Sequence, residues 1–287
     1  MNEAMVAKFR EGGSGRGTAH SHSLFLAAFF VLFLLTPEAR AAETPPSIAG
    51  ERVEILAGSA FSATQPMLFG VRMTMREGWH TYWRKPGDSG IAPRFDWSAS
   101  GNVADVKLLW PAPERFDVEG DMTVGYEREV IWPVLVRAAD PKKPVTLDMK
   151  MSYGVCSDIC VPGEAHRVYK LLPASAATPA AFAASGNLIR AYLSRVPAEP
   201  EKSGDVAVTL TGMILHATLK GVRETPALIV EGPRGIWFGK PRATRNGETL
   251  DYAVPVEIEG DAALKGGEVT LTFSGSSTAI EATRKVE

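Results

Sequence analysis

The chain has 287 residues, with 31 lysines and arginines against 33 aspartates and glutamates, so its formal charge at neutral pH is −2. A balance this close to neutral, without a clustered basic patch, argues against nucleic acid or an anionic membrane surface as the partner. The length is sufficient for one large domain or two small ones.

The N-terminus has the pattern of a secretory signal. Basic residues precede an uninterrupted apolar run of twelve residues, Leu24–Leu35, and the small-residue site Ala39-Arg40-Ala41 follows it. A helix that spans a membrane needs about 20 apolar residues, so this run is too short for an anchor. We therefore predict that residues 1–41 are a cleaved export signal and that the mature chain does not span the membrane.

Residues 42–173 have the alternation of antiparallel strands. Apolar and polar side chains alternate in segments bounded by Gly, Pro, Asp and Asn, at residues 53–56, 68–75, 130–136, 145–153 and 168–172. Period-two alternation is typical of strands with one buried face. Several such strands at short spacing predict an all-β fold, an immunoglobulin-like β-sandwich.

The pattern changes over residues 174–203, which are rich in alanine and carry three prolines. Residues 180–195 predict a helix, and Pro179 suits its first turn. The apolar residues expected roughly on one side of it are Phe182, Leu188, Ile189, Tyr192 and Leu193. We interpret residues 174–203 as a helical linker.

Residues 204–287 predict a second, smaller β domain. Its expected strands are residues 206–210, 214–219, 228–230, 254–258 and 269–273. Asn246-Gly247 indicates a hairpin, because both central positions of a type I′ turn favour positive φ.

The chain has only two cysteines, Cys156 and Cys160. Cα atoms of bridged cysteines lie about 4.4–6.8 Å apart, whereas positions i and i+4 of a continuous strand are about 13 Å apart. The chain must therefore turn between them if they pair, and Ser157 and Asp158 favour a turn. We expect a tight hairpin or loop with both sulfurs at its tip.

Three roles remain open for this pair. A loop of about five residues gives a disulfide only roughly 2 kcal/mol of stabilisation, which weakens the case for a structural bridge. A local pair on a turn is well suited to opening and closing in redox chemistry. The third role is metal binding.

Four segments carry a family resemblance: Gly78–Gly90 (GWHTYWRKPGDSG), Trp110–Phe116 (WPAPERF), Gly125–Glu127 (GYE) and Val155–Gly163 (VCSDICVPG). In this order they resemble the N-terminal periplasmic domain of the DsbD/ScsB family of thiol:disulfide interchange proteins. The resemblance covers roughly residues 50–172. Three residues separate the cysteines here, against five in the best-known DsbD domains, so the ScsB-like branch is the more similar.

The resemblance implies a periplasmic immunoglobulin-like domain. Its catalytic pair would be Cys156 and Cys160, which would take electrons from a thioredoxin-like domain and pass them to periplasmic thioredoxin-fold proteins. The sequence has no phosphate-binding glycine loop and no dinucleotide fingerprint, so we expect no cofactor. The sequence ends before the membrane conduit of full-length members, so we expect a separate membrane electron donor.

The resemblance also implies a cap loop that shields the disulfide with aromatic side chains. By the order of the segments, Phe116 and then Tyr126 are the candidates, and ordinary sandwich packing is the alternative for both. Asp158 would hold a proton or raise the thiol pKa through its charge. The alternative for Asp158 is a plain turn residue.

Other patterns leave further alternatives open. Two Met-X-Met pairs, Met73 with Met75 and Met149 with Met151, are either Cu(I) ligands near the cysteines or core residues. Trp79, Tyr82 and Trp83 form either an exposed docking patch or part of the core. The histidines have no zinc-binding spacing, and we predict no metal site. The remaining function class is a binding module that keeps the disulfide as a scaffold.

The sequence also gives an expectation for which sulfur a partner attacks. Pro162 restricts Val161 to extended geometry, which would hold the chain after Cys160 rigid. We therefore expect the partner's thiol to bond to Cys156.

Overall fold

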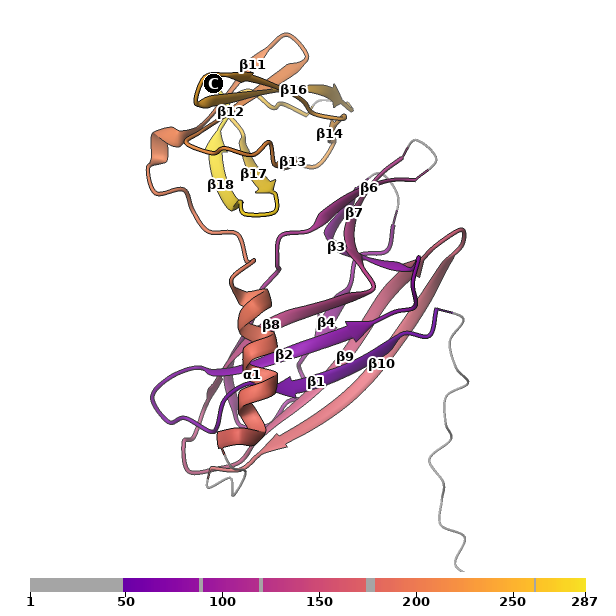
Figure 1. The fold of residues 1–287 in the computed structure, drawn as a ribbon, viewed down its shortest axis with the longest axis vertical. Helices are drawn as coiled ribbons and strands as arrows, with labels where there is room; N and C mark the ends of the chain where they lie inside the picture. Colours follow the sequence, from indigo (N-terminus) through magenta and orange to yellow (C-terminus); the bar gives the residue numbers. More distant parts are fainter. Residues whose placement is uncertain (1–48, 88–89, 119–120, 174–178, 261) are drawn as a thin grey trace, which may run out of the picture. The chain divides into compact units, whose positions relative to one another are not determined.

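The computed structural model describes residues 49–87, 90–118, 121–173, 179–260 and 262–287. The predicted signal at residues 1–41 lies outside this range, as do residues 174–178 of the predicted linker. The described residues form eighteen strands, one α-helix and a short 3-10 helix (Figure 1). The prediction of an all-β fold is confirmed.

Strands β1–β10 form the first domain, a sandwich of two antiparallel sheets. One sheet has the strand order β1-β2-β8-β5, with β1 (Arg52–Ala57), β2 (Met67–Thr74), β8 (Glu129–Ala138) and β5 (Val103–Leu108). The other has the order β10-β9-β3-β7-β6, and β4 also pairs with β9. Its members are β3 (His80–Gly87), β4 (Arg94–Asp96), β6 (Glu114–Val118), β7 (Asp121–Glu127), β9 (Val145–Cys156) and β10 (Cys160–Leu171).

The core of the first domain lies between these sheets. On β9, every second side chain is buried in it, namely Val145, Leu147, Met149, Met151 and Tyr153. Trp83 of β3 and Trp132 of β8 join them from the two sheets. Full burial of such a side chain stabilises the fold by roughly 1.5–3 kcal/mol, so the alternation determines which face of each strand is turned inward.

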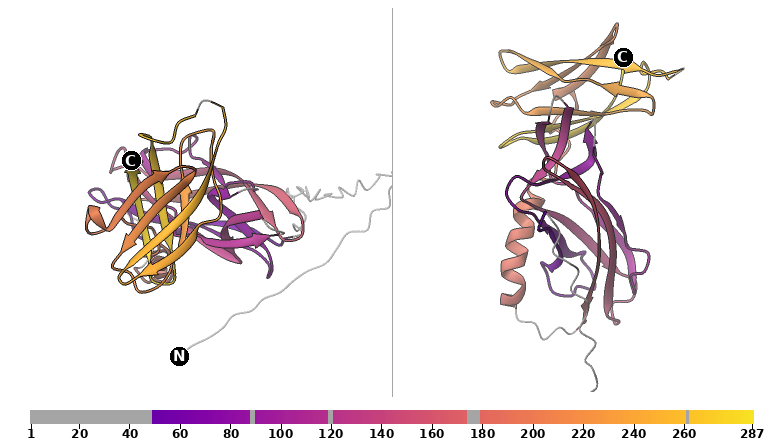
Figure 2. Two further views of the ribbon diagram at one scale, coloured as in Figure 1. Left: turned by 90° about the horizontal axis from the view of Figure 1, so that it is seen from above. Right: turned by 90° about the vertical axis from the view of Figure 1, so that its right-hand side faces the viewer.

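Helix α1 (Pro179–Leu193) packs against β8, β2 and β1 of the first domain (Figure 2). Ile189 is its fully buried contact. A Cβ atom at Gly70 would lie 2.9 Å from a methylene carbon of Ile189, so glycine on β2 permits the close approach of the helix.

Leu188 was expected on roughly the same side of the helix as Phe182 and Ile189, but it is 44% exposed. The buried positions are Phe182, Gly186 and Ile189, which are spaced four and three residues apart on one helical face, and Leu188 lies off that face. α1 has 15 residues, and no helix in the described part of the chain is long and apolar enough to cross a bilayer.

Strands β11–β18 form the second domain, which follows the 3-10 helix η1 (Ser203–Asp205). Its larger sheet contains β11 (Val206–Thr211), β12 (Ile214–Lys220), β16 (Thr249–Ile258), β14 (Ile236–Phe238) and β15 (Arg242–Asn246). Its smaller sheet has the order β13-β17-β18, with β13 (Ala227–Glu231), β17 (Glu268–Ser274) and β18 (Ala279–Lys285). The two sheets enclose a separate core cluster, and Figures 1 and 2 show them as two layers.

The predicted hairpin at Asn246-Gly247 is present with its turn one residue later. Asn246 pairs with Thr249, so the connecting residues are Gly247 and Glu248. Gly247 has a φ of 64°, while neither Asn246 nor Glu248 has a positive φ. Glycine at the first central position is the pattern of a type II′ turn rather than the expected type I′ turn.

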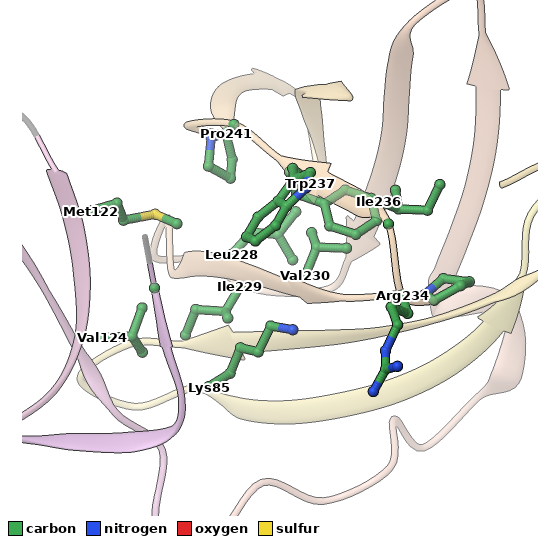
Figure 3. Close-up of a pocket in the computed structure, with 16 residues that line it drawn as sticks. Lys85, Met122, Val124, Leu228, Ile229, Val230, Arg234, Ile236, Trp237 and Pro241 are labelled. Atoms are coloured by element: carbon green, nitrogen blue, oxygen red, sulfur yellow. The ribbon is translucent and has the colours of Figure 1, made fainter. Parts of the chain in front are cut away.

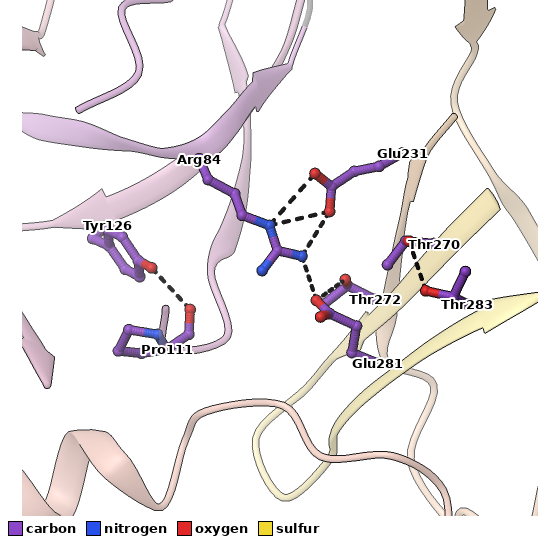
Figure 4. A network of polar contacts seen from close by, with 8 residues as sticks. All are labelled: Arg84, Pro111, Tyr126, Glu231, Thr270, Thr272, Glu281 and Thr283. Atoms are coloured by element: carbon purple, nitrogen blue, oxygen red, sulfur yellow. Dashed lines mark hydrogen bonds and ion pairs between the residues drawn. The ribbon is translucent and has the colours of Figure 1, made fainter. Parts of the chain in front are cut away.

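Arg84 connects strand β3 of the first domain to the second domain (Figure 4). Its guanidinium donates to Glu231 on β13, with an Nη2–Oε2 distance of 2.7 Å, and to Glu281 on β18. Glu281 also accepts from the Thr272 hydroxyl on β17, at 3.0 Å. Burial opposes the charge of Arg84, but the hydrogen bonds and charges of the two glutamates outweigh it and raise the pKa of the guanidinium. Arg84 therefore contacts β13 and β18 of the smaller sheet directly, and it is linked to β17 through Glu281.

We predict that Arg84→Gln lowers the free energy of unfolding by about 1–3 kcal/mol, because it leaves two partly buried carboxylates without their cation. Urea denaturation at pH 7 measures this change as a lower midpoint. Arg94→Gln removes an exposed arginine of β4 and serves as the control. Equal midpoints for the two variants would contradict a stabilising role for the Arg84 network.

Candidate functional site

The β9–β10 hairpin brings the two cysteines together. The strands pair along their whole length, from Val145 opposite Leu171 to Cys156 opposite Cys160. Residues 157–159 form the connecting loop, in which the Ser157 N–H donates to the Ile159 carbonyl at 3.1 Å. The sulfurs form a disulfide, and the Cα atoms are 4.1 Å apart. The expected turn between the cysteines is confirmed.

The two cysteines differ in exposure. Cys156 lies on β9, inside the sheet between β10 and β3, and is only 1% exposed. Its neighbour on β3 is His80, the residue that pairs with it in register. Cys160 begins the edge strand β10 and is exposed. A thiol from another protein therefore has access to the Cys160 side of the disulfide.

The hydroxyl of Tyr82 contacts both sulfurs. It lies 2.6 Å from Cys156 Sγ and 3.3 Å from Cys160 Sγ. A disulfide has no proton to give, so the tyrosine is the donor. Tyr82 is 2% exposed, and its burial raises the pKa of the phenol, which keeps the donor protonated at physiological pH.

The Tyr82 ring is held in place by a close backbone approach. Gly90 has a φ of 148°, and a Cβ atom there would lie 2.3 Å from the tyrosine ring. Only glycine fits this position without displacing the ring. The adjacent strand pairing is reinforced by the Thr81 hydroxyl, which donates to the Gly154 carbonyl of β9 at 2.9 Å.

His80 and Phe116 extend this aromatic cluster. The His80 ring packs edge-on against Tyr82, with centroids 5.5 Å apart, and lies 5.4 Å from the Phe116 ring. His80 is buried, and the loss of water lowers the pKa of its imidazole below the ordinary 6.5, against a smaller opposite effect of Glu127. The imidazole is therefore neutral at pH 7.

The three residues expected around the disulfide lie in different places. Phe116 joins the cluster through His80, as described above. Tyr126 packs in the core against Trp132 rather than beside the sulfurs, and its hydroxyl donates to the Pro111 carbonyl at 2.8 Å. The reason is its register opposite Thr81, whose side chain points away from the face of His80 and Tyr82. Asp158 is exposed in the loop between the cysteines.

Two exposed apolar residues flank the disulfide. Ile159 precedes Cys160 and is 54% exposed. Ile91 is 41% exposed, and its carbonyl accepts from the Gly154 N–H of β9 at 3.2 Å. Exposed apolar side chains beside an accessible sulfur form a surface suited to a protein partner.

The structure also shows where the two Met-X-Met pairs and the aromatic patch lie. The four methionines Met73, Met75, Met149 and Met151 are buried in the core of the first domain, which favours packing over copper binding. The aromatic patch is divided: Trp83 is buried in the core and Trp79 packs against it, whereas Tyr82 faces the disulfide.

Sequence reasoning missed His80 and Tyr82 as site residues. His80 and Tyr82 are two residues apart, which indicates that their side chains share one face of a strand. Thr81 and Trp83 belong to the opposite face. What the sequence did not reveal is that β3 pairs with β9 at Cys156, more than seventy residues later.

Comparisons with known proteins agree with this geometry. A family model described as the N-terminal domain of the thiol:disulfide interchange protein DsbD matches residues 52–172. The crystal structure of the N-terminal periplasmic domain of ScsB from Proteus mirabilis superposes with a TM-score of 0.65 at 26% sequence identity, covering 85% of this chain and 96% of that chain. The chain carries a DsbD/ScsB N-terminal domain.

The DsbD/ScsB-type domain is a thiol:disulfide interchange module whose cysteines form the disulfide described above. The likeness to ScsB extends beyond residues 52–172, which are less than half of the chain, and so includes the second domain. A model for a domain of unknown function (DUF8393) matches residues 195–287. No curated protein matches the chain.

We predict that Tyr82→Phe makes the disulfide harder to reduce. The hydroxyl donates more strongly to the thiolate of the reduced state than to the neutral disulfide, so its loss costs the reduced state more. We expect a shift of about three- to tenfold in the equilibrium with a glutathione or dithiothreitol buffer, measured by counting free thiols.

Tyr252→Phe is the matched control for this experiment. It removes another buried hydroxyl, which donates to the Pro226 carbonyl at 2.7 Å and touches no sulfur. An unchanged equilibrium for Tyr82→Phe, or an equal shift for both variants, would contradict the role of Tyr82.

We also predict that His80 makes the fold less stable in mild acid. Its folded-state pKa is lowered, so below about pH 6.5 the unfolded chain takes up a proton that the folded chain does not. The contribution of a neutral His80 to the free energy of unfolding is complete at pH values above the pKa of His80 in the unfolded chain. It is lost as the pH falls toward the lower pKa of His80 in the folded chain, by at most about 1.4 kcal/mol per pH unit.

Urea denaturation at pH 7.5 and about pH 5.5 compares the wild type with His80→Phe, which keeps an aromatic ring in the cluster. The variant is expected to lose less stability on acidification than the wild type. His216→Gln changes an exposed histidine of β12 and is expected to behave like the wild type. An unchanged pH dependence in His80→Phe would show that His80 does not titrate with unfolding.

Proposed function

We propose that the domain is a periplasmic redox relay, in which the Cys156–Cys160 disulfide accepts two electrons from one thioredoxin-like protein and passes them to another. The observation that carries this proposal is the asymmetric disulfide at the tip of the β9–β10 hairpin. One cysteine is exposed, the other is covered, and a tyrosine hydroxyl contacts both sulfurs. Catalytic roles for Cys156 and Cys160 are part of the proposal.

Each half of the relay is a pair of thiol–disulfide exchanges. A thiolate of the reduced donor attacks Cys160 Sγ, forms a mixed disulfide, and displaces Cys156 as a thiolate. The donor's second thiol then attacks the donor sulfur of the mixed disulfide and releases Cys160. The donor dithiol is thereby oxidised to a disulfide, and Cys156–Cys160 is reduced to two thiols with uptake of two electrons and two protons. The reverse sequence reduces the disulfide of an acceptor.

Tyr82 supports the step in which Cys156 leaves. Its hydroxyl is already 2.6 Å from Cys156 Sγ, so it donates to the thiolate as that sulfur acquires charge. Phe116 packs against the His80 ring, which in turn packs against Tyr82. We propose that Phe116 is the cap residue that shields this side of the aromatic cluster. The exposed Ile91 and Ile159 supply an apolar contact for the partner next to Cys160.

The location and the partners are also proposals. The similar ScsB domain is periplasmic, and the apolar run at Leu24–Leu35 supports export to the same compartment. We propose a donor held in the membrane and acceptors with thioredoxin folds. We further propose that residues 1–41 are the export signal, that residues 42–173 carry the redox pair, and that a linker over residues 174–203 leads to the second domain at residues 204–287.

The exposures favour Cys160 as the sulfur that bonds to partners, contrary to the expectation of Cys156 from the sequence. Rigidity after Cys160 was the reason for that expectation, but Cys156 lies inside the sheet, paired with β3, and is 1% exposed, whereas Cys160 on the edge strand is exposed. We predict that Cys156→Ser captures a thioredoxin-like partner lacking its resolving cysteine several-fold more efficiently than Cys160→Ser. Non-reducing gel electrophoresis measures the mixed disulfide, with the double serine variant as the blank.

Greater capture by Cys160→Ser would reverse this assignment while leaving the relay intact. The relay itself is tested by equilibrating the wild type in glutathione buffers. A disulfide that stays closed at potentials below roughly −300 mV would identify a structural bridge and a binding module instead of a relay.

A further inference from the structure

A cavity of about 370 Å³ lies between strands β13 and β14 of the second domain and strands β3 and β7 of the first (Figure 3). Its apolar wall includes Leu228 and Val230 from β13, Ile236 and Phe238 from β14, and Met122 and Val124 from β7. Small-molecule sites in proteins have volumes of about 300–1,000 Å³ and are lined mainly by apolar side chains. The cavity has the size and the lining of such a site, and it shares no lining residue with the disulfide cluster.

The charged side chains among the described lining residues are both positive. Among the described residues that line it, the charged ones are Lys85 of β3 and Arg234 in the loop between β13 and β14, and none of these described residues is a carboxylate. Both side chains are exposed, which places them where a ligand's polar group would meet solvent. The lining thus combines an apolar interior with two cations, which complements an anion on an apolar body.

Trp237 lies at the same cavity and is 59% exposed. An indole presents a large apolar surface, and leaving it in water forgoes the stabilisation that its burial would give. Its neighbours Ile236 and Phe238 are buried or half-buried. A ligand in the cavity would cover the indole face, so Trp237 also provides an optical signal for binding.

We propose that this cavity binds a small amphipathic carboxylate, with the carboxylate at Lys85 and Arg234 and the apolar body against Leu228, Val230 and Trp237. The proposal is independent of the redox relay. A cationic amphiphile fits poorly because its head group would be repelled by Lys85 and Arg234. A purely apolar molecule would leave the two cations unused.

The test uses decanoate as the probe, below its critical micelle concentration, with the whole mature chain. Isothermal titration calorimetry and tryptophan fluorescence are expected to show saturable binding at a ratio of one to one. Decyltrimethylammonium, which has the same chain with a positive head, is expected to bind at least tenfold more weakly or not at all.

Substitutions of the residues that line the cavity test whether decanoate binds there. Lys85→Gln with Arg234→Gln is expected to weaken decanoate binding by about tenfold, because each partly exposed charge contact contributes a factor of about three. Trp237→Phe is expected to remove the fluorescence change while the calorimetric signal remains. Lys107→Gln with Arg94→Gln removes two exposed charges elsewhere on β5 and β4 and is the matched control.

Three results would overturn the proposal: no saturable binding of decanoate, equal binding of decanoate and decyltrimethylammonium, or equal affinity in the Lys85/Arg234 variant and the control. The glutathione equilibrium of the disulfide is measured on the same samples. Since the cavity and the disulfide share no residue, loss of decanoate binding with an intact redox equilibrium would refute this site without affecting the relay.

Discussion

The antiparallel register of β9 and β10 is the constraint on which the site depends. Because Cys156 stands directly opposite Cys160, the two sulfurs meet and bond across the end of the hairpin. The same register places β9 inside the sheet and β10 at its edge, so that one cysteine is covered and the other reaches solvent. Twelve paired positions hold this register, and the core-facing alternation of β9 prevents a slip.

Strand β3 adds the second half of the site. It pairs with β9 at Cys156 and turns His80 and Tyr82 toward the disulfide face, while Trp83 enters the core. Arg84, the next residue, binds carboxylates of the second domain. Tyr82, which contacts the disulfide, and Arg84, which binds the second domain, are therefore two residues apart on one strand, and Trp83 between them packs in the core.

The sequence predicted the features that depend on local pattern. Alternation identified β1, β2, β8 and β9, and the cysteine spacing with Ser157 and Asp158 predicted the turn at the sulfurs. The hairpin before β16 was predicted, but its turn lies one residue later, because the pairing of whole strands rather than the preference of Asn246 sets the register. The long-range features were not predictable: Tyr82 reaches the sulfurs, and Tyr126 enters the core, through strand pairings between distant segments.

The three consecutive side chains of Tyr82, Trp83 and Arg84 have consequences for sequence change in this family. A substitution at any one of them alters one contact, but the insertion or deletion of a single residue just before them would exchange all three environments at once. An indole would then face the sulfurs and a charged or phenolic group would face the core, so we expect this stretch of β3 to tolerate substitutions better than changes in length. Length variation in the domain belongs instead in segments outside the paired strands, where no side chain loses its face.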